Sequence, residues 1–144
     1  MTSNEQTRDR FIGAWHLTSC TVTQADGSQV FPYGRRPNGV ILYTPDGWMS
    51  CQLRGGDWAS DEADASGPSG PIHYSSYYGS FSIDERREVV VHHVAGSSEP
   101  TVHGNQERHY RFEGDSLILE AQTNGVSARL EWHRAPPGPA STQV

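Results

Sequence analysis

The sequence predicts an all-β fold: a single closed or nearly closed antiparallel up-and-down β-barrel of about eight strands, preceded by a short N-terminal helix. Three observations predict it. Short strand-like runs alternate with turn sequences that contain Gly, Asp or Pro. Helical periodicity is almost absent. The 144 residues fit one domain, and about eight strands are enough to close a barrel that holds one small ligand.

The expected strands follow one another with short connections. The run 15–24 ends at Asp26-Gly27, and the sequence TPDG joins the runs 40–43 and 48–53 with residues typical of a hairpin turn. Further strands are expected at 77–83, 88–94, 106–112, 116–121 and 126–134. Residues 1–10 form an N-terminal segment in which Ser3 or Asn4 caps a short helix that closes one end of the barrel at 11–134.

Two segments depart from this pattern. Residues 54–75 are rich in Gly, Ser, Asp and Pro and contain the isolated Trp58, so they form either a lid over the barrel mouth or a disordered loop. The Pro-rich, polar tail 135–144 is expected to be disordered.

Composition and charge limit the classes of binding partner that we expect. The net charge is -6, lysine is absent and the arginines are scattered, which disfavours nucleic acid and anionic membranes. The polar N-terminus lacks the apolar core of a secretory signal, so we expect a cytoplasmic protein, monomeric or homodimeric. In that reducing setting Cys20 and Cys51 are expected to be free, buried thiols.

Several motifs together resemble a known family. In chain order they are Gly13-Ala14-Trp15, GVILYTPDGWMSCQL, YYGSFSIDE, VVVHHVAGS, QERHYRFEGDSL and ARLEWHR. They are similar to the strands of the bacterial and fungal lipocalin-like domain family and cover most of residues 10–134. The resemblance implies a ligand-holding barrel in which Arg134 packs over Trp15 in a structural role. The Gly/Ser/Asp-rich middle segment departs from the apolar, partly helical segment common in the family.

Strand alternation places an arginine inside the barrel. In the run 106–112, Glu107, His109 and Arg111 form a solvated face, which turns Gln106, Arg108, Tyr110 and Phe112 inward. A buried arginine is costly unless it is paired. Arg108 therefore faces either an interior carboxylate or an anionic or carbonyl group of a ligand.

The His92-His93 pair has one member on each face of its strand. The apolar neighbours Val90 and Val94 favour His92 as the inward one. An inward histidine is either an acid/base or ligand-anchoring partner of Arg108, or a hydrogen-bonded core residue. Gly79, in the preceding strand, suits a close approach of ligand or neighbouring backbone.

The predicted ligand-binding set consists mainly of aromatic residues: Tyr43, Trp48, Trp58, Tyr77, Phe81, Gln106 and Phe112. Trp48 shares a face with Ser50 and Gln52, which is either the barrel exterior or a source of polar pocket contacts. No metal motif appears among the seven histidines, and no cofactor is expected, with haem held by a single histidine kept as an alternative.

Two functional hypotheses follow. In the first, the barrel binds a small hydrophobic metabolite and acts as a cofactor-independent cyclase, isomerase or dehydratase on a polyketide- or terpenoid-type intermediate of secondary metabolism. Arg108 and Tyr110 would polarise a carbonyl or enolate, and His92 would move the proton. In the second, the barrel is a non-catalytic binder or carrier. Polar groups that converge at mid-cavity favour the first hypothesis, and polar groups confined to the rim favour the second.

Overall fold

A computed structural model describes residues 3–55 and 74–138 of the chain. Helix α1 (Ser3–Phe11) comes first. Nine strands follow: β1 (Gly13–Thr23), β2 (Gln29–Val30), β3 (Asn38–Tyr43), β4 (Trp48–Arg54), β5 (Tyr74–Asp84), β6 (Val89–Ser97), β7 (Gly104–Glu113), β8 (Ser116–Thr123) and β9 (Val126–Arg134).

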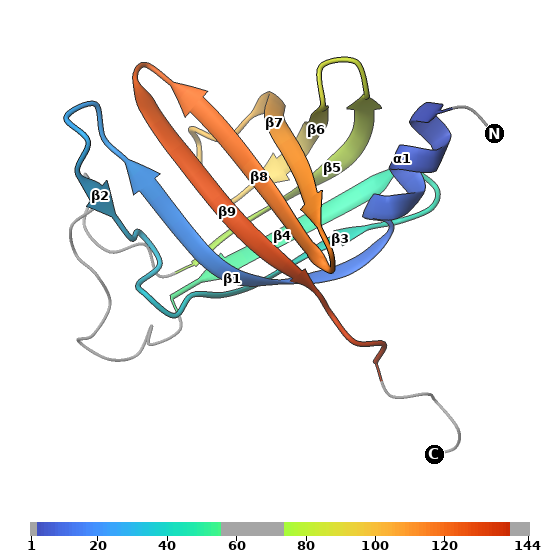
Figure 1. Cartoon of the computed structure of the whole chain (residues 1–144), viewed down its shortest axis with the longest axis horizontal. Coiled ribbons are helices and arrows are strands. Elements are labelled where there is room, and N and C mark those ends of the chain that lie inside the picture. The colour runs from blue at the N-terminus through green and yellow to red at the C-terminus, as the bar shows by residue number, and fades with distance from the viewer. Residues whose placement is uncertain (1–2, 56–73, 139–144) are drawn as a thin grey trace.

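The strands form one antiparallel sheet that closes on itself. From β3 to β9 each strand pairs with the next along the chain, and β1 pairs with both β3 and β9, which completes a barrel of eight strands (Figure 1). The short β2 is an extra strand that pairs with the end of β1 through Val22 and Val30. The predicted fold class is confirmed, and β2 escaped prediction because two residues carry no periodicity.

Inward and outward side chains alternate along the strands. In β4, Met49, Cys51 and Leu53 are buried, and in β3 Ile41 and Tyr43 are buried. The pleat of each strand turns these side chains to one face, where they pack into a single core. Cys20 and Cys51 are both free and buried, as expected.

A bulge between β5 and β6 explains the glycine of the Tyr-Tyr-Gly motif. The register of the two strands shifts between Tyr78 and Gly79. A Cβ atom on Gly79 would lie 1.9 Å from the carbonyl oxygen of His93, which no side chain tolerates. The predicted close approach at Gly79 is confirmed, and the approaching group is neighbouring backbone.

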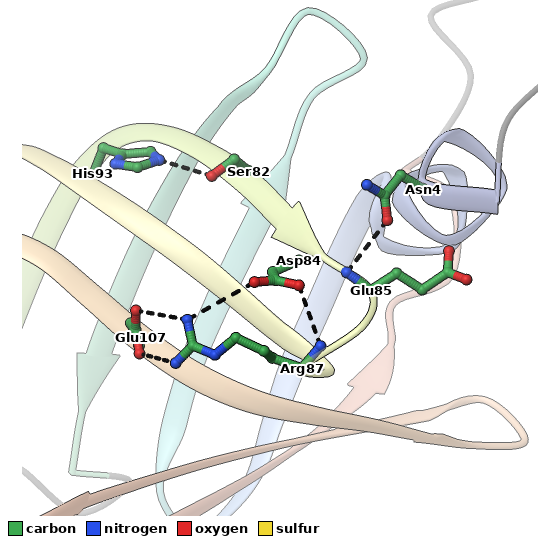
Figure 2. Close-up of polar contacts among 7 residues, drawn as sticks. All are labelled: Asn4, Ser82, Asp84, Glu85, Arg87, His93 and Glu107. Carbon is green, nitrogen blue, oxygen red and sulfur yellow. Dashed lines mark hydrogen bonds and ion pairs between the residues drawn. The ribbon is translucent and has the colours of Figure 1, made fainter.

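Helix α1 closes one end of the barrel. It lies beside the β3–β4 and β5–β6 turns (Figure 1), and the Asn4 side chain accepts a hydrogen bond from the Glu85 backbone N–H at 3.2 Å (Figure 2). The fully buried Phe11 makes edge-on contacts with Tyr43, Tyr110 and Phe112 at centroid distances of 5.2, 5.1 and 4.9 Å. The barrel is therefore plugged with aromatic rings at this end.

Strands β1 and β9 contact each other through Trp15 and Arg134, next to the end of the barrel that α1 closes. Arg134 lies over the Trp15 ring, with its guanidinium carbon 3.9 Å from the ring centroid. Trp15 donates its indole N–H to the Phe11 carbonyl at 2.9 Å. The packing that the family resemblance implied for these two residues is confirmed.

Two predictions fall outside the described residues. Most of the segment 54–75, with Trp58, belongs to the stretch 56–73, and the end of the tail belongs to 139–144. Among the helices of the described residues, none is long and apolar enough to span a bilayer.

Candidate functional site

A cavity of about 250 Å³ lies inside the barrel. Its wall reaches Val22 near the end of β1, Leu53 near the end of β4 and Ser75 near the start of β5, so it extends toward the barrel end opposite α1. Most of the wall is formed by apolar and thiol side chains, among them Cys20, Ile41, Cys51, Leu119, Leu130 and Trp132. A mainly apolar space inside a barrel, with few polar groups, is typical of a small-molecule site.

A second hollow of about 220 Å³ lies on the outer face of β3, β4 and β5. Its wall includes His16, Gln52, Arg54 and the half-exposed Tyr74. These side chains face solvent, and the Tyr74 hydroxyl donates to Gln52 at 2.7 Å. The inner cavity is therefore the better candidate, because it removes more of an apolar molecule from water.

Arg108 is the charged residue of the inner wall. It stands on β7 between the buried Tyr110 and the half-buried Gln106, as strand alternation predicted. Its guanidinium donates to the Glu107 carbonyl at 3.0 Å and to the Gln106 amide oxygen at 3.4 Å, both on its own strand. These contacts hold the guanidinium at the cavity and leave other N–H groups for a bound molecule.

Behind the wall, His92 joins two tyrosines in the core. The Tyr43 hydroxyl lies 2.7 Å from His92 Nε2, and the Tyr77 hydroxyl lies 2.8 Å from His92 Nδ1. His92 is fully buried, which confirms that it is the inward histidine of the pair. Its neighbour His93 lies on the outer face, with Nε2 2.8 Å from the Ser82 hydroxyl (Figure 2).

His92 is neutral in the folded protein. Burial lowers its pKa from 6.5 to about 3, and the nearby charge of Arg108 acts in the same direction. A neutral imidazole has one N–H donor and one acceptor nitrogen, and the two tyrosine hydroxyls satisfy both. His92 is thus a fully hydrogen-bonded core residue that reaches the cavity only through Tyr77, which lines it.

The ionisable thiol and phenol groups around the cavity are neutral as well. Burial raises the pKa of Cys20 and of Cys51 to about 12, and it raises the pKa values of Tyr33, Tyr43 and Tyr77 above their ordinary range. The Arg108 charge opposes the shift at Tyr43, Cys51 and Tyr77 without reversing it. At neutral pH these thiols and phenols can therefore donate hydrogen bonds but carry no charge.

The structure brings only part of the predicted site together. Arg108 and Tyr77 line the cavity, Gln106 touches Arg108, and Tyr43 and His92 lie behind Tyr77. Three other predicted aromatics belong to the plugged end: the buried Tyr110 and the half-buried Phe112 pack on Phe11, and the buried Phe81 lies 4.9 Å from Tyr43.

One predicted ligand-binding residue points away from the interior. Trp48 is 51% exposed on the outer face of β4, opposite in the pleat to the buried Met49. Ser50 and Gln52 follow it on that face, which settles the alternative between exterior and pocket in favour of the exterior. Trp58 is not among the described residues.

Some wall residues were not predicted as site residues. Cys51 and Trp132 are inward members of their strands, and strand alternation could have nominated them. Tyr33 comes from the connection between β2 and β3, where there is no periodicity to interpret. Its buried hydroxyl lies beside Ser75.

A comparison against protein-family models identifies the family of this closed barrel. The lipocalin-like domain model matches residues 12–135. The chain belongs to this family. A lipocalin-like barrel of this kind is a fold that supports binding of small hydrophobic ligands in its interior. A comparison with curated proteins finds no match.

Proposed function

We propose that this lipocalin-like barrel binds one small, largely apolar molecule in its inner cavity. The observation that carries the proposal is the cavity itself, which lies inside the barrel and is walled mainly by apolar side chains. Its volume of about 250 Å³ exceeds the roughly 150 Å³ of a buried cavity that holds benzene. It falls just short of the roughly 300 Å³ at which drug-sized pockets begin. A ligand of one or two fused rings, or a branched chain of similar volume, fits these limits.

Binding can be tested with 2-naphthamide, a neutral fluorescent bicyclic probe. We expect saturable, one-to-one binding to the wild-type protein. Ala128→Phe, which places a ring in the cavity, should abolish it, because Ala128 is part of the wall. Ser127→Phe is the matched control, because the adjacent residue of β9 faces outward. Equal binding by both variants, or no binding by the folded wild type, would contradict the proposal.

Turnover of the bound molecule is the second candidate, as a cofactor-independent cyclisation, isomerisation or dehydration of a polyketide- or terpenoid-type intermediate. It is favoured by the contact of Tyr77 with both the cavity and His92. The Tyr77 hydroxyl could donate a hydrogen bond to a carbonyl oxygen that gains negative charge, while Arg108 stabilises that charge. For a substrate with a carbonyl group, each of the three reactions can proceed through an enol, in which the α-carbon loses a proton to water and the carbonyl oxygen gains one.

That shared step can be measured without knowledge of the natural substrate. The probe is 1-phenylbutane-1,3-dione in D₂O, and the readout is deuterium uptake at the carbon between its carbonyl groups, followed by NMR. Catalysis predicts faster uptake with wild-type protein than with Arg108→Gln. A bound diketone that exchanges at the solvent rate would instead support the binder or carrier. Cytoplasmic location and a monomeric or homodimeric state stay predictions.

A further inference from the structure

The positive charge of Arg108 lacks a carboxylate partner among the described residues. Other arginines of the barrel have one: Arg87 pairs with Glu107 at 2.7 Å, Arg111 with Glu113 at 2.7 Å and Arg129 with Glu131 at 3.1 Å. These three pairs lie on the outer surface, where water already screens the charges. Arg108 is half-buried on the inner wall, where water screens a charge less than at the outer surface, and its partners there are two neutral oxygens.

The groups packed around Arg108 do not balance its charge. His92, Tyr43, Tyr77 and Cys51 all lie within its electrostatic influence. Burial keeps each of them in its neutral form at physiological pH. The part of the cavity wall that the structure describes therefore carries one net positive charge.

Two residues of the wall have N–H donors without a hydrogen-bond acceptor. Trp132, which lines the cavity and is 1% exposed, has an indole N–H with no hydrogen-bond partner. It is the one such buried side-chain atom among the described residues. Arg108 has five N–H donors, of which its neutral partners occupy only some. A buried donor without an acceptor is costly, so a bound molecule with acceptor oxygens would relieve the shortage.

A carboxylate supplies both a negative charge for Arg108 and acceptor oxygens for the N–H donors of the wall that have no partner. We infer that the ligand is a small organic monoanion, a carboxylic acid in its ionised form, whose carboxylate binds the Arg108 guanidinium and whose apolar body fills the cavity. This inference rests on the proposed function, because it names the class of molecule that the same cavity holds. A planar guanidinium suits a carboxylate especially well, since two parallel N–H···O bonds can form.

The inference is tested with three probes that share one ring system: 2-naphthoate, 2-naphthamide and naphthalene. At pH 7 the first is an anion, the second is a neutral amide and the third has no polar group. We expect wild-type protein to bind 2-naphthoate about 10- to 100-fold more tightly than 2-naphthamide by isothermal titration calorimetry. Arg108→Gln should remove this preference and leave naphthalene binding nearly unchanged.

Two further variants separate a local contact from a general effect of charge or folding. Arg108→Lys keeps the charge but loses the planar fork, so it should retain part of the preference. Arg111→Gln removes an outward arginine from the same strand and should keep the full preference.

The outcomes distinguish the two proposals. If all three probes bind equally tightly, the carboxylate inference is wrong and the proposed function stands. If none of them binds to the folded protein, both are wrong. If Arg111→Gln lowers 2-naphthoate binding as much as Arg108→Gln, the preference reflects overall charge, and the assignment to Arg108 is overturned.

Discussion

The Tyr77 hydroxyl lies 2.8 Å from His92 Nδ1 and thereby joins the cavity wall to a polar group in the core. The same imidazole meets Tyr43 through its other nitrogen at 2.7 Å. An uncharged series of three hydrogen-bonded side chains, Tyr77, His92 and Tyr43, thus runs from the cavity toward the plugged end. Because both ring nitrogens of His92 have hydrogen-bond partners, these three side chains can be buried without a large cost in stability.

The first prediction concerns pH and His92. Its pKa is lower in the folded state, about 3 against 6.5, so the unfolded chain takes up the proton first as the pH falls. Its contribution to stability is therefore complete above about pH 6.5 and is lost progressively toward pH 3. We expect wild-type protein to lose on the order of 3 kcal/mol from this group between pH 6.5 and pH 4.

His92→Gln isolates this effect, because glutamine can bond to both tyrosines and does not titrate. Urea unfolding at several pH values should show a flatter dependence for this variant in that window. His93→Gln, on the outer face, is the control and should keep the wild-type slope. A wild-type slope in His92→Gln would show that the buried histidine is not responsible.

Removal of the Tyr43 hydroxyl should destabilise the barrel. Tyr43→Phe keeps the ring contacts with Phe11 and Phe81 but leaves His92 Nε2 without its partner. We expect the free energy of unfolding to fall by about 1–3 kcal/mol, the cost of an unsatisfied buried polar atom. Tyr78→Phe, at a 54% exposed position, should change it very little. Equal effects in urea unfolding would argue against the buried network.

Arg134 should be important for the plug as well as for the Trp15 contact. Its guanidinium donates to the carbonyls of Ile12 and Arg10 at 2.7 Å each, at the C-terminal end of α1. We expect Arg134→Ala to cost about 2–3 kcal/mol and to speed hydrogen exchange in α1. Arg129→Ala, which breaks a solvent-exposed ion pair, should cost no more than about 1 kcal/mol. Unchanged exchange in α1 would contradict this role.

The bulge at Gly79 predicts a sharp intolerance to side chains. Gly79→Ala would bring a methyl group against the His93 carbonyl. Because this carbonyl belongs to the backbone of β6, which is paired with β5, the two strands must separate to make room. We expect a loss of at least about 3 kcal/mol in urea unfolding. Ser80→Ala, one residue further along β5, should lie within about 0.5 kcal/mol of wild type. A mild effect of Gly79→Ala would mean that the strands are not paired as described.

Strand alternation predicted well whether a side chain faces inward or outward. It predicted poorly whether an inward side chain lies at the cavity or at the plugged end. The charged residues Glu107, His109 and Arg111 identified the outer face of β7, so Arg108 was correctly placed inside. Tyr110 and Phe112 share that inner face, but they lie at the end that α1 plugs. Their surroundings depend on where Phe11 packs. That is a long-range contact, which the local sequence pattern does not contain.

Two other misses have local causes. Trp48 was included in the predicted ligand-binding set while its face was left open between exterior and pocket, and the register that Met49 and Cys51 impose on β4 turns it outward. Tyr33 was overlooked because it lies in an irregular connection, where neither face nor depth follows from sequence spacing. Arg108 was the residue most open to prediction, because a charge on an otherwise uncharged inner face requires an explanation.

The most direct test of the central claim is the crystal structure of the protein with 6-bromo-2-naphthoate, in which anomalous scattering locates the bromine atom. We expect a single bromine inside the barrel, among the apolar wall residues that include Ile41, Leu119 and Leu130, with the carboxylate at Arg108. A bromine in the outer hollow beside His16 and Tyr74 would contradict binding in the inner cavity. So would crystals of the ligand-saturated protein that show no bromine inside the barrel.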